Sequence, residues 1–295
     1  NKIPSKDGGI ALTHLLNENG FIESELTVTR LAPEHFYVLS AAVAQLHDFD
    51  QLIWRKHAFE QVTVDDVTDA FGTLVLAGPR ARDTLEKCTN TDLSNAAFRW
   101  LTGKSAEVAG VSGVRLLRVN YVGELGWMAD MPKVFEALLT AGKPYGIALF
   151  GTYAMNSLRM EKAYRGWGSE LTAEIDMYEA SMERFIRMDK ADFIGKAATA
   201  KRIGHERMKL VYMSVENTDS DCVGNEPVYH GDTLVGVTTS GGFGHAVEQS
   251  LAFAYVPPAL AAAGTHFDVL MFGEKRRATV LPDVSWDPQN IRLKA

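Results

Sequence analysis

Alternating apolar and polar residues predict several strands in the first part of the chain. Residues 26–31 read Leu-Thr-Val-Thr-Arg-Leu, and residues 36–39 repeat the pattern after Pro33. Alternation with β-branched residues is typical of half-buried strands, so these two segments are predicted to pair through a short turn. Further extended stretches are predicted at residues 62–64, 73–77 and 113–121.

Helical spacing of apolar residues takes over between these strands. The pattern predicts helices at residues 80–87, 135–141 and 153–163, and Thr152 is placed to cap the last of them. Strands interleaved with helices through residue 200 indicate an α+β region.

The pattern changes at about residue 205, where short strands and turn signals alternate. The predicted strands are residues 209–213, 227–229, 234–237, 251–256 and 278–281. Their spacing is typical of a small barrel or sandwich. A domain boundary is therefore predicted near Gly204, giving domains 1–204 and 205–295, and residues 240–244 are read as a glycine-rich loop.

Composition narrows the function. The chain has 295 residues, 46% of them hydrophobic, and a formal net charge of -7. A negative chain gives no broad positive field for nucleic acid, and no apolar run approaches the roughly 18 residues that span a bilayer. Neither nucleic acid nor a membrane is expected as a partner. Cys88 and Cys222 stand far apart without a partner motif, which favours reduced thiols and a reducing compartment.

Familiar catalytic signatures and metal-ligand spacings are absent, so no metal is expected. A first candidate site is the turn and strand at residues 20–26. Strand alternation puts Glu23 and Glu25 on one face and Ser24 on the other, so the two carboxylates could couple for acid–base work. The alternative is two solvated carboxylates on a strand face.

The second candidate is the segment at residues 121–127, in which two glycines flank Glu124 between Tyr121 and Trp127. Such a loop lets aromatic rings and backbone approach a flat ligand, and Glu124 could accept hydrogen bonds from it. A tight β-turn with packing aromatics is the alternative.

The third candidate is a set of three cations, Arg159, Lys162 and Arg165, at helical spacing. They could meet the anionic tail of a ligand, or they could form a solvated cationic stripe.

Together these segments resemble the glycine cleavage T-protein (aminomethyltransferase) superfamily, and more closely the folate domains of dimethylglycine and sarcosine dehydrogenases. The resemblance is carried by "ESELTVTRL", "NYVGELGW", "GTYAMNSLRMEKAYRGWG", "DFIGKAA" and "TTSGGFGHAVEQSLAFAYVP". It implies an α+β, T-protein-like folate-binding fold with a small C-terminal β-barrel domain. It also implies that the sequence starts inside the module, without its first segment.

The resemblance also implies residue roles. Glu25 matches the family's acidic residue that assists proton transfer around the folate nitrogens, and Tyr121 matches a tyrosine on the folate site. At Met155 the T-proteins have an arginine that meets the folate tail, whereas the dehydrogenase-type domains have methionine. Of the three cations at helical spacing, Arg159 is the one expected to bind the cofactor.

One position departs from the family pattern. The family's pterin-binding carboxylate follows the aromatic residue of "G-W-E", and this chain has Met128 there. A thioether cannot pair with the N–H donors of a pterin, so Glu124 or Asp130 would have to replace the carboxylate.

The implied function is tetrahydrofolate-dependent one-carbon transfer, which captures the oxidised N-methyl group of dimethylglycine or sarcosine as 5,10-methylenetetrahydrofolate. The implied partner is a flavin oxidoreductase domain, in cis or in trans, with FAD held upstream of this module. The expected location is the cytoplasm, or the mitochondrial matrix in a eukaryote. The alternatives are a non-catalytic structural or interaction module and a stand-alone folate-dependent aminomethyltransferase or demethylase.

Overall fold

The computed structural model describes residues 1–119, 126–128, 131–217 and 219–294. The chain forms two compact units. The first unit comprises Asn1–Thr13, Ser24–Leu149 and Arg292–Ala295, and the second comprises His14–Glu23 and Phe150–Ile291. The boundary predicted near Gly204 lies inside the second unit and stays a prediction. Among the described helices, none is both long and apolar enough to cross a membrane.

The predicted strand pair is present and is part of a three-stranded sheet in the order β1-β2-β3. Its strands are β1 (Ile10–Leu16), β2 (Ile22–Ala32) and β3 (His35–Leu39). β2 and β3 are antiparallel, with Val28 opposite Val38. On β2 buried and half-buried residues alternate from Ile22 to Val28, as the sequence pattern predicted, but the alternation ends at Thr29, which is also buried.

A second sheet in the first unit has the antiparallel order β4-β7-β6-β5. Its strands are β4 (Thr73–Val75), β7 (Gly126–Met128), β6 (Val111–Leu117) and β5 (Gly103–Val108). Val114 and Leu116 of β6 are fully buried and pack in one core with residues of α2 (Ala81–Glu86) and α3 (Met131–Gly142). The predicted helices at 80–87 and 135–141 are thereby confirmed.

Some of the first unit differs from the sequence expectations. Residues 62–64 form no strand, and α1 (Gln45–Trp54) was not predicted. The remaining short helices of the described residues are η1 (Ala42–Ala44), η2 (Thr68–Ala70), η3 (Lys143–Tyr145), η4 (Glu183–Phe185), η5 (Pro258–Leu260), α5 (Lys196–Arg202) and α6 (Ile291–Lys294).

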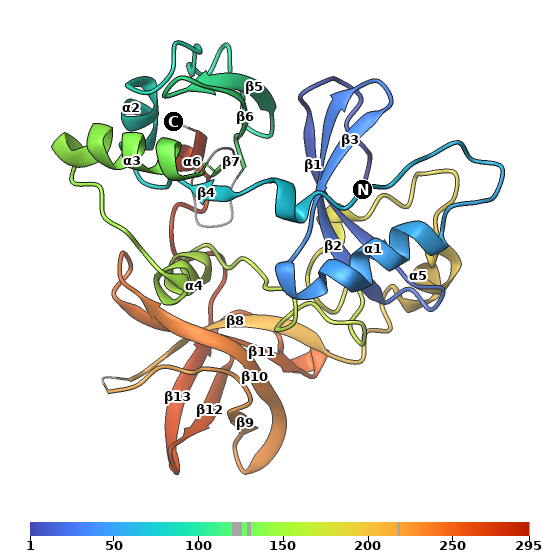
Figure 1. Ribbon diagram of the computed structural model, residues 1–295. Coiled ribbons are helices and arrows are strands. Elements are labelled where there is room, and N and C mark those ends of the chain that lie inside the picture. Colours follow the sequence, from blue (N-terminus) through green and yellow to red (C-terminus); the bar gives the residue numbers. More distant parts are fainter. Residues whose placement is uncertain (120–125, 129–130, 218, 295) are drawn as a thin grey trace. The chain divides into compact units, whose positions relative to one another are not determined.

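The second unit contains a closed barrel with the strand order β10-β11-β8-β13-β12-β9 (Figure 1). Its strands are β8 (Lys209–Val215), β9 (Pro227–His230), β10 (Thr233–Gly244), β11 (Gln249–Val256), β12 (His266–Met271) and β13 (Glu274–Val280). The α+β class with a C-terminal barrel is confirmed. The loop predicted at residues 240–244 is wrong, because these residues continue β10 and pair with β11, Gly241 opposite Ala252.

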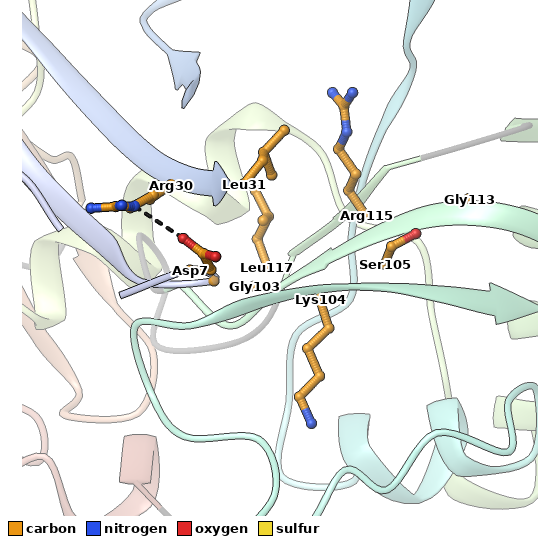
Figure 2. A pocket seen from close by; sticks show the side chains of 10 residues that line it. Asp7, Arg30, Leu31, Gly103, Lys104, Ser105, Gly113, Arg115 and Leu117 are labelled. Carbon is orange, nitrogen blue, oxygen red and sulfur yellow. Dashed lines mark hydrogen bonds and ion pairs between the residues drawn. The ribbon is translucent and has the colours of Figure 1, made fainter. Parts of the chain in front are cut away.

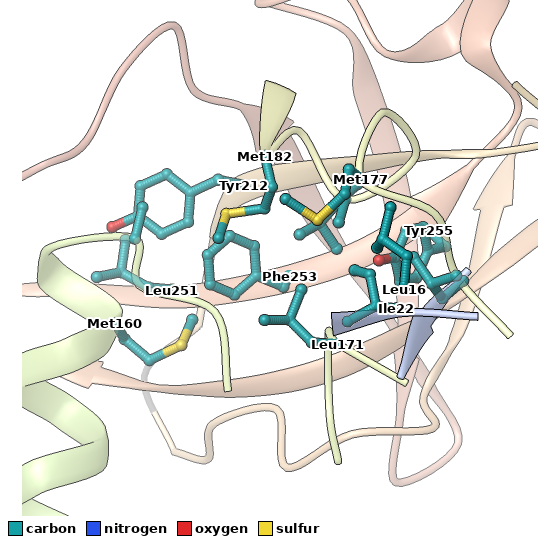
Figure 3. Close-up of a cluster of buried hydrophobic side chains, with 14 residues drawn as sticks. Leu16, Ile22, Met160, Leu171, Met177, Met182, Tyr212, Leu251, Phe253 and Tyr255 are labelled. Atoms are coloured by element: carbon teal, nitrogen blue, oxygen red, sulfur yellow. The ribbon is translucent and has the colours of Figure 1, made fainter. Parts of the chain in front are cut away.

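α4 (Thr152–Glu161) lies against β10 and closes one hydrophobic core of the second unit. Figure 3 shows this core, in which Met160 of α4 joins Leu251 and Phe253 of β11. Leu16 and Ile22, from the turn region between β1 and β2, belong to the same core. A segment from the beginning of the chain is therefore built into the second unit.

Candidate functional site

The turn before β2 is fixed by its own hydrogen bonds and by its packing. The side-chain carbonyl of Asn17 accepts hydrogen bonds from the backbone N–H groups of Asn19 (3.0 Å) and Phe21 (3.1 Å). Gly20 has φ +80°, and a Cβ there would lie 2.9 Å from the backbone nitrogen of Thr199. Only glycine fits this turn without strain, so the start of β2 has a defined position.

Neighbouring residues of the second unit hold the same turn. The guanidinium of Arg202 lies 3.9 Å from the centre of the Phe21 ring, and that of Arg207 lies 5.0 Å from it. The backbone N–H of Ile22 donates to the carbonyl of Ile175 at 2.9 Å. These contacts anchor the strand that leads to Glu25.

Glu25 lies on β2, three residues after Ile22. Ser24 and Leu26 are buried, whereas Glu23 and Glu25 are half-buried, so the two carboxylates share the more open strand face. A half-buried carboxylate can accept or donate a proton when a ligand reaches it. The structure thus places Glu25 where strand alternation predicted, and its catalytic role stays a prediction.

The structure describes residues 126–128 of the predicted ligand-binding segment. Tyr121 and Glu124 lie outside the described residues. Met128 ends β7, where its backbone pairs in register with Thr73 of β4 and Arg115 of β6. The assignments of these three residues to a folate site also stay predictions.

The predicted cationic stripe is wrong, because the three side chains are neither aligned on one helix nor exposed to solvent. α4 ends at Glu161, so Lys162 and Arg165 lie beyond the helix that was expected to align them with Arg159. Arg159 and Lys162 are only 5% and 4% exposed, and Arg165 is half-buried. The three side chains make separate contacts with neighbouring backbone instead of forming a solvated stripe.

Arg159 is part of a buried polar network between α4 and the barrel. Its Nη1 donates to Glu170 at 2.9 Å and to the carbonyl of Tyr164 at 3.1 Å. Glu170 also accepts from the backbone of Gly166 at 2.7 Å and from the hydroxyl of Thr239 at 2.6 Å. This ion pair compensates the charge of Arg159 inside the second unit, whereas its predicted role in cofactor binding remains a prediction.

Lys162 and Arg165 contact backbone carbonyls. The ammonium of Lys162 donates to the carbonyls of Trp286 (3.1 Å) and Asp287 (2.8 Å), and Arg165 donates to the carbonyl of Ala163 at 2.8 Å. Burial lowers the pKa of both side chains, because it disfavours the charged form. Both cations therefore serve to hold loops in place.

Sequence reasoning missed Glu170, which is fully buried. It follows Gly166 and Gly168 in a segment of irregular backbone, so no helical or strand spacing connects it to Arg159. Met155, by contrast, lies half-buried on α4, one turn before Arg159. Glu25 belongs to the first unit, whereas Met155 and Arg159 belong to the second.

Comparisons with known proteins cover both parts of the chain. Residues 1–190 match the model of the GCVT N-terminal domain, and residues 209–287 match the glycine cleavage T-protein C-terminal barrel domain. The solved structure of glycine cleavage system aminomethyltransferase T from Bartonella henselae aligns with a TM-score of 0.83 and 25% identity. That alignment covers 96% of this chain and 77% of the other.

Two curated relatives are similar in sequence. Mitochondrial dimethylglycine dehydrogenase of Mus musculus is 39% identical over 100% of this chain, and the chain spans 35% of that protein. An aminomethyltransferase of Koribacter versatilis (strain Ellin345) is 32% identical over 91% of this chain and 72% of its own length. From the match of both family models and the shared fold, the chain belongs to the glycine cleavage T-protein family.

Proposed function

We propose that the chain is the tetrahydrofolate-binding one-carbon transfer module of a dimethylglycine or sarcosine dehydrogenase-type enzyme. The observation that carries the proposal is the similarity to dimethylglycine dehydrogenase along the whole chain, which spans only 35% of that relative. The half-buried Glu25, on the strand after a turn that requires glycine, supports it.

Glu25 fits such a ligand, because a half-buried carboxylate can meet a reacting amine and still exchange protons with solvent. Tetrahydrofolate, when bound, supplies the nitrogen that takes up the one-carbon unit. A carboxylate oxygen of Glu25 accepts the proton that this nitrogen loses and returns it to the departing substrate amine. Closing the 5,10-methylene bridge removes a second N–H proton from tetrahydrofolate, and the product amine would carry both protons away as a secondary ammonium.

The proposed partner is a flavin oxidoreductase domain, in cis or in trans, that holds FAD and oxidises the N-methyl group. Transfer within one assembly raises the effective concentration of the reactive one-carbon unit near its acceptor. It also limits the escape of that unit into water.

A second candidate function is a structural or interaction module that no longer binds folate. Two observations favour it. Met128 stands where the resembled family has its pterin-binding carboxylate. In addition, the guanidinium of Arg159 is engaged with Glu170 inside the second unit.

Calorimetric titration of tetrahydrofolate into the chain, under anaerobic and reducing conditions, separates the two functions. Micromolar binding by the unmodified chain would support the transfer module. Absence of binding, restored in the Met128→Glu variant, would support the structural module, because a carboxylate at this position supplies the acceptor that a thioether lacks.

The role of Glu25 is tested in the complete enzyme, with Glu23→Gln as the matched control on the same strand face. We expect Glu25→Gln to slow one-carbon transfer by roughly a hundredfold, the usual scale for a lost acid–base group. Folate affinity should stay within a few-fold. The measurement is the rate of one-carbon capture by tetrahydrofolate against the rate of formaldehyde release. An unchanged capture rate in Glu25→Gln would rule out this role.

A further inference from the structure

The helix α1 of the first unit presents its apolar stripe to solvent. Leu46, Ile53 and Trp54 are spaced i, i+7 and i+8, so they share one face of the helix. All three are exposed, Leu46 at 77% and Trp54 at 73%. Asp48, by contrast, lies on the buried side of α1. An amphipathic helix normally turns its apolar stripe to the core, so the stripe of α1 is left uncovered by the described residues.

The connection that leads from α1 to β4 extends this apolar surface (Figure 1). Residues 56–63 are all exposed. The ring of Phe59 stacks on that of His57, with ring centres 5.3 Å apart. The amide of Gln45, at the start of α1, donates to Asp66 at 2.8 Å, which ties the connection to the helix. We call this surface the α1 face; its exposed apolar residues are Val43, Leu46, Ile53, Trp54, Phe59 and Val62.

Apolar residues elsewhere in the first unit have neighbours that cover them. At the hollow shown in Figure 2, Leu117 is buried and packs in one cluster with Ile10 and Tyr37. Arg30, at the side of the same hollow, pairs with Asp7 at 3.0 Å. The apolar and charged groups of the hollow are thus already engaged, in contrast to the apolar residues of the α1 face.

The rim of the α1 face is acidic. Residues 48–69 include six acidic residues but only two arginine or lysine residues. Asp50, Asp65 and Asp69 are all exposed. Opposite charges across an interface favour association, whereas like charges disfavour it. A second copy of this chain would bring two acidic rims together, so the charge favours a partner with a basic rim.

The lengths of the relatives indicate which partner is missing. In mitochondrial dimethylglycine dehydrogenase of Mus musculus the matched region is 35% of the polypeptide, so about two thirds of that protein lies outside it. In the aminomethyltransferase of Koribacter versatilis the matched region is 72%. Domains of one polypeptide commonly meet through interfaces of about 600–1,500 Å². A module of the dehydrogenase type therefore needs a docking surface for the rest of its enzyme.

We propose that the α1 face docks the flavin oxidoreductase domain. Leu46, Trp54 and Phe59 form the apolar centre of the contact, in which large aromatic side chains contribute most to binding. Lysine or arginine side chains of the flavin domain surround this centre and pair with the acidic rim. The proposal rests on the proposed function, because it takes its partner from there.

Hydroxyl-radical footprinting, which oxidises exposed side chains, tests the proposal on the complete enzyme. The sample is one polypeptide that contains both parts, or a mixture of the two where they are separate. We expect Trp54 and Phe59 to be oxidised at least fivefold more slowly in the complete enzyme than in this chain alone. Phe272, which is 90% exposed in the turn after β12, is the reference for the radical dose. Equal oxidation rates of Trp54 and Phe59 in the two samples would overturn the proposal.

Sedimentation of this chain alone tests a second copy as the occupant. We expect a monomer at micromolar concentration, because two acidic rims repel each other. A dimer that Leu46→Glu dissociates would overturn the proposal, since the α1 face would then bind a second copy.

Variants of the complete enzyme test the apolar centre. Leu46→Glu should raise the oxidation rates of Trp54 and Phe59 at least threefold, because it places a charge in the contact. Phe272→Glu is the matched control, since it places the same charge at an exposed apolar position on the barrel, and it should leave both residues protected. Protection that survives Leu46→Glu would contradict the assignment of this centre.

A second pair of variants tests the rim. Asp65→Lys/Asp69→Lys should also raise the oxidation rate of Trp54, because the reversed charges repel a basic rim. Asp232→Lys, which reverses a charge in the exposed turn after β9, is the control and should not. Protection unchanged by Asp65→Lys/Asp69→Lys would contradict the basic rim of the partner.

The footprinting needs no folate, so its result is read separately from the folate titration. Protected Trp54 and Phe59 in an enzyme that binds no tetrahydrofolate would support docking and contradict the transfer function. Unprotected Trp54 and Phe59 in an enzyme that binds tetrahydrofolate would contradict docking alone.

Discussion

At the scale of single residues, the ion pair between Arg159 and Glu170 is buried and bears on stability. Their side chains are 6% and 0% exposed, and the N–O distance is 2.9 Å. Removing one partner of a buried pair leaves the other charge without compensation in a medium of low polarity. The pair therefore fixes the position of α4 against β10, to which Glu170 is joined through Thr239 and Ser240.

We expect Glu170→Ala to lower the free energy of unfolding of the second unit by about 3–5 kcal/mol, the usual cost of breaking a buried ion pair. The double variant Arg159→Met/Glu170→Met should recover part of this loss, because both charges are then gone. Urea unfolding followed by tryptophan fluorescence measures both values. A single variant as stable as the unmodified chain would show that the pair is not a structural element.

At the scale of elements, the β1–β2 turn depends on the glycine at position 20. Gly20 and Gly231 both have positive φ, at +80° and +62°, but only Gly20 has no room for a Cβ. The backbone of Thr199 occupies that space, whereas the surroundings of Gly231 are open. A substitution at Gly231 therefore tests backbone strain alone, whereas a substitution at Gly20 tests backbone strain together with steric overlap.

Gly231→Ala should cost about 1 kcal/mol, the strain of a left-handed backbone at a non-glycine residue. Gly20→Ala should cost about 2–4 kcal/mol, because the new methyl group also displaces the chain at Thr199. Thermal unfolding of the two variants gives the comparison. Equal losses of stability would mean that the turn can shift away from α5 at little cost.

Local pattern predicted the elements in which one face is buried and the other is open. β2, β3 and the barrel strands β8 and β11 have such patterns or continuous apolar runs, and the sequence located each of them. α1 was missed, and its apolar residues do not form its buried face: Asp48 is buried, whereas Leu46 and Trp54 are 77% and 73% exposed. The residues at 62–64 have β-branched side chains but no neighbouring strand to pair with among the described residues.

The candidate site was less predictable than the fold. The position of Glu25 follows from strand alternation, which depends only on local sequence. Glu170 pairs with Arg159 because the irregular segment after α4 folds back on the helix. No periodic pattern in the sequence predicts that contact. The spacing of Arg159, Lys162 and Arg165 was misleading because the helix ends at Glu161.

At the scale of the whole molecule, buried carboxylates make the stability of the chain depend on pH. Glu179 is fully buried. Burial raises its pKa, but hydrogen bonds from Arg207 and from the backbone of Asp176 outweigh burial, so the pKa of Glu179 is below its ordinary value of 4.5. A lowered carboxyl pKa stabilises the folded chain above the ordinary pKa, and this contribution is lost as the pH falls through the folded pKa.

Glu179→Gln should therefore lower stability by about 1–3 kcal/mol at pH 7, the scale of a lost hydrogen bond to a charged group. The difference from the unmodified chain should shrink as the pH falls below about 4.5. Urea unfolding between pH 7 and pH 3 measures it. Asp189→Asn is the control, since its ion pair with Arg187 is exposed. A difference that stays constant with pH would contradict the assignment to Glu179.

Leu16 and Ile22 are part of the hydrophobic core that contains Met160 and Phe253 (Figure 3), and this has a consequence for synthesis on the ribosome. The hairpin tip emerges roughly 130 residues before α4, a delay of about ten seconds at 5–20 residues per second. During that time the side chains of Leu16 and Ile22 stay exposed, because the residues that cover them in the core have not yet been synthesised. A nascent chain stalled between residues 23 and 150 should therefore be the form that recruits chaperones, and a fragment starting at residue 150 should fold only when the hairpin is supplied as a peptide.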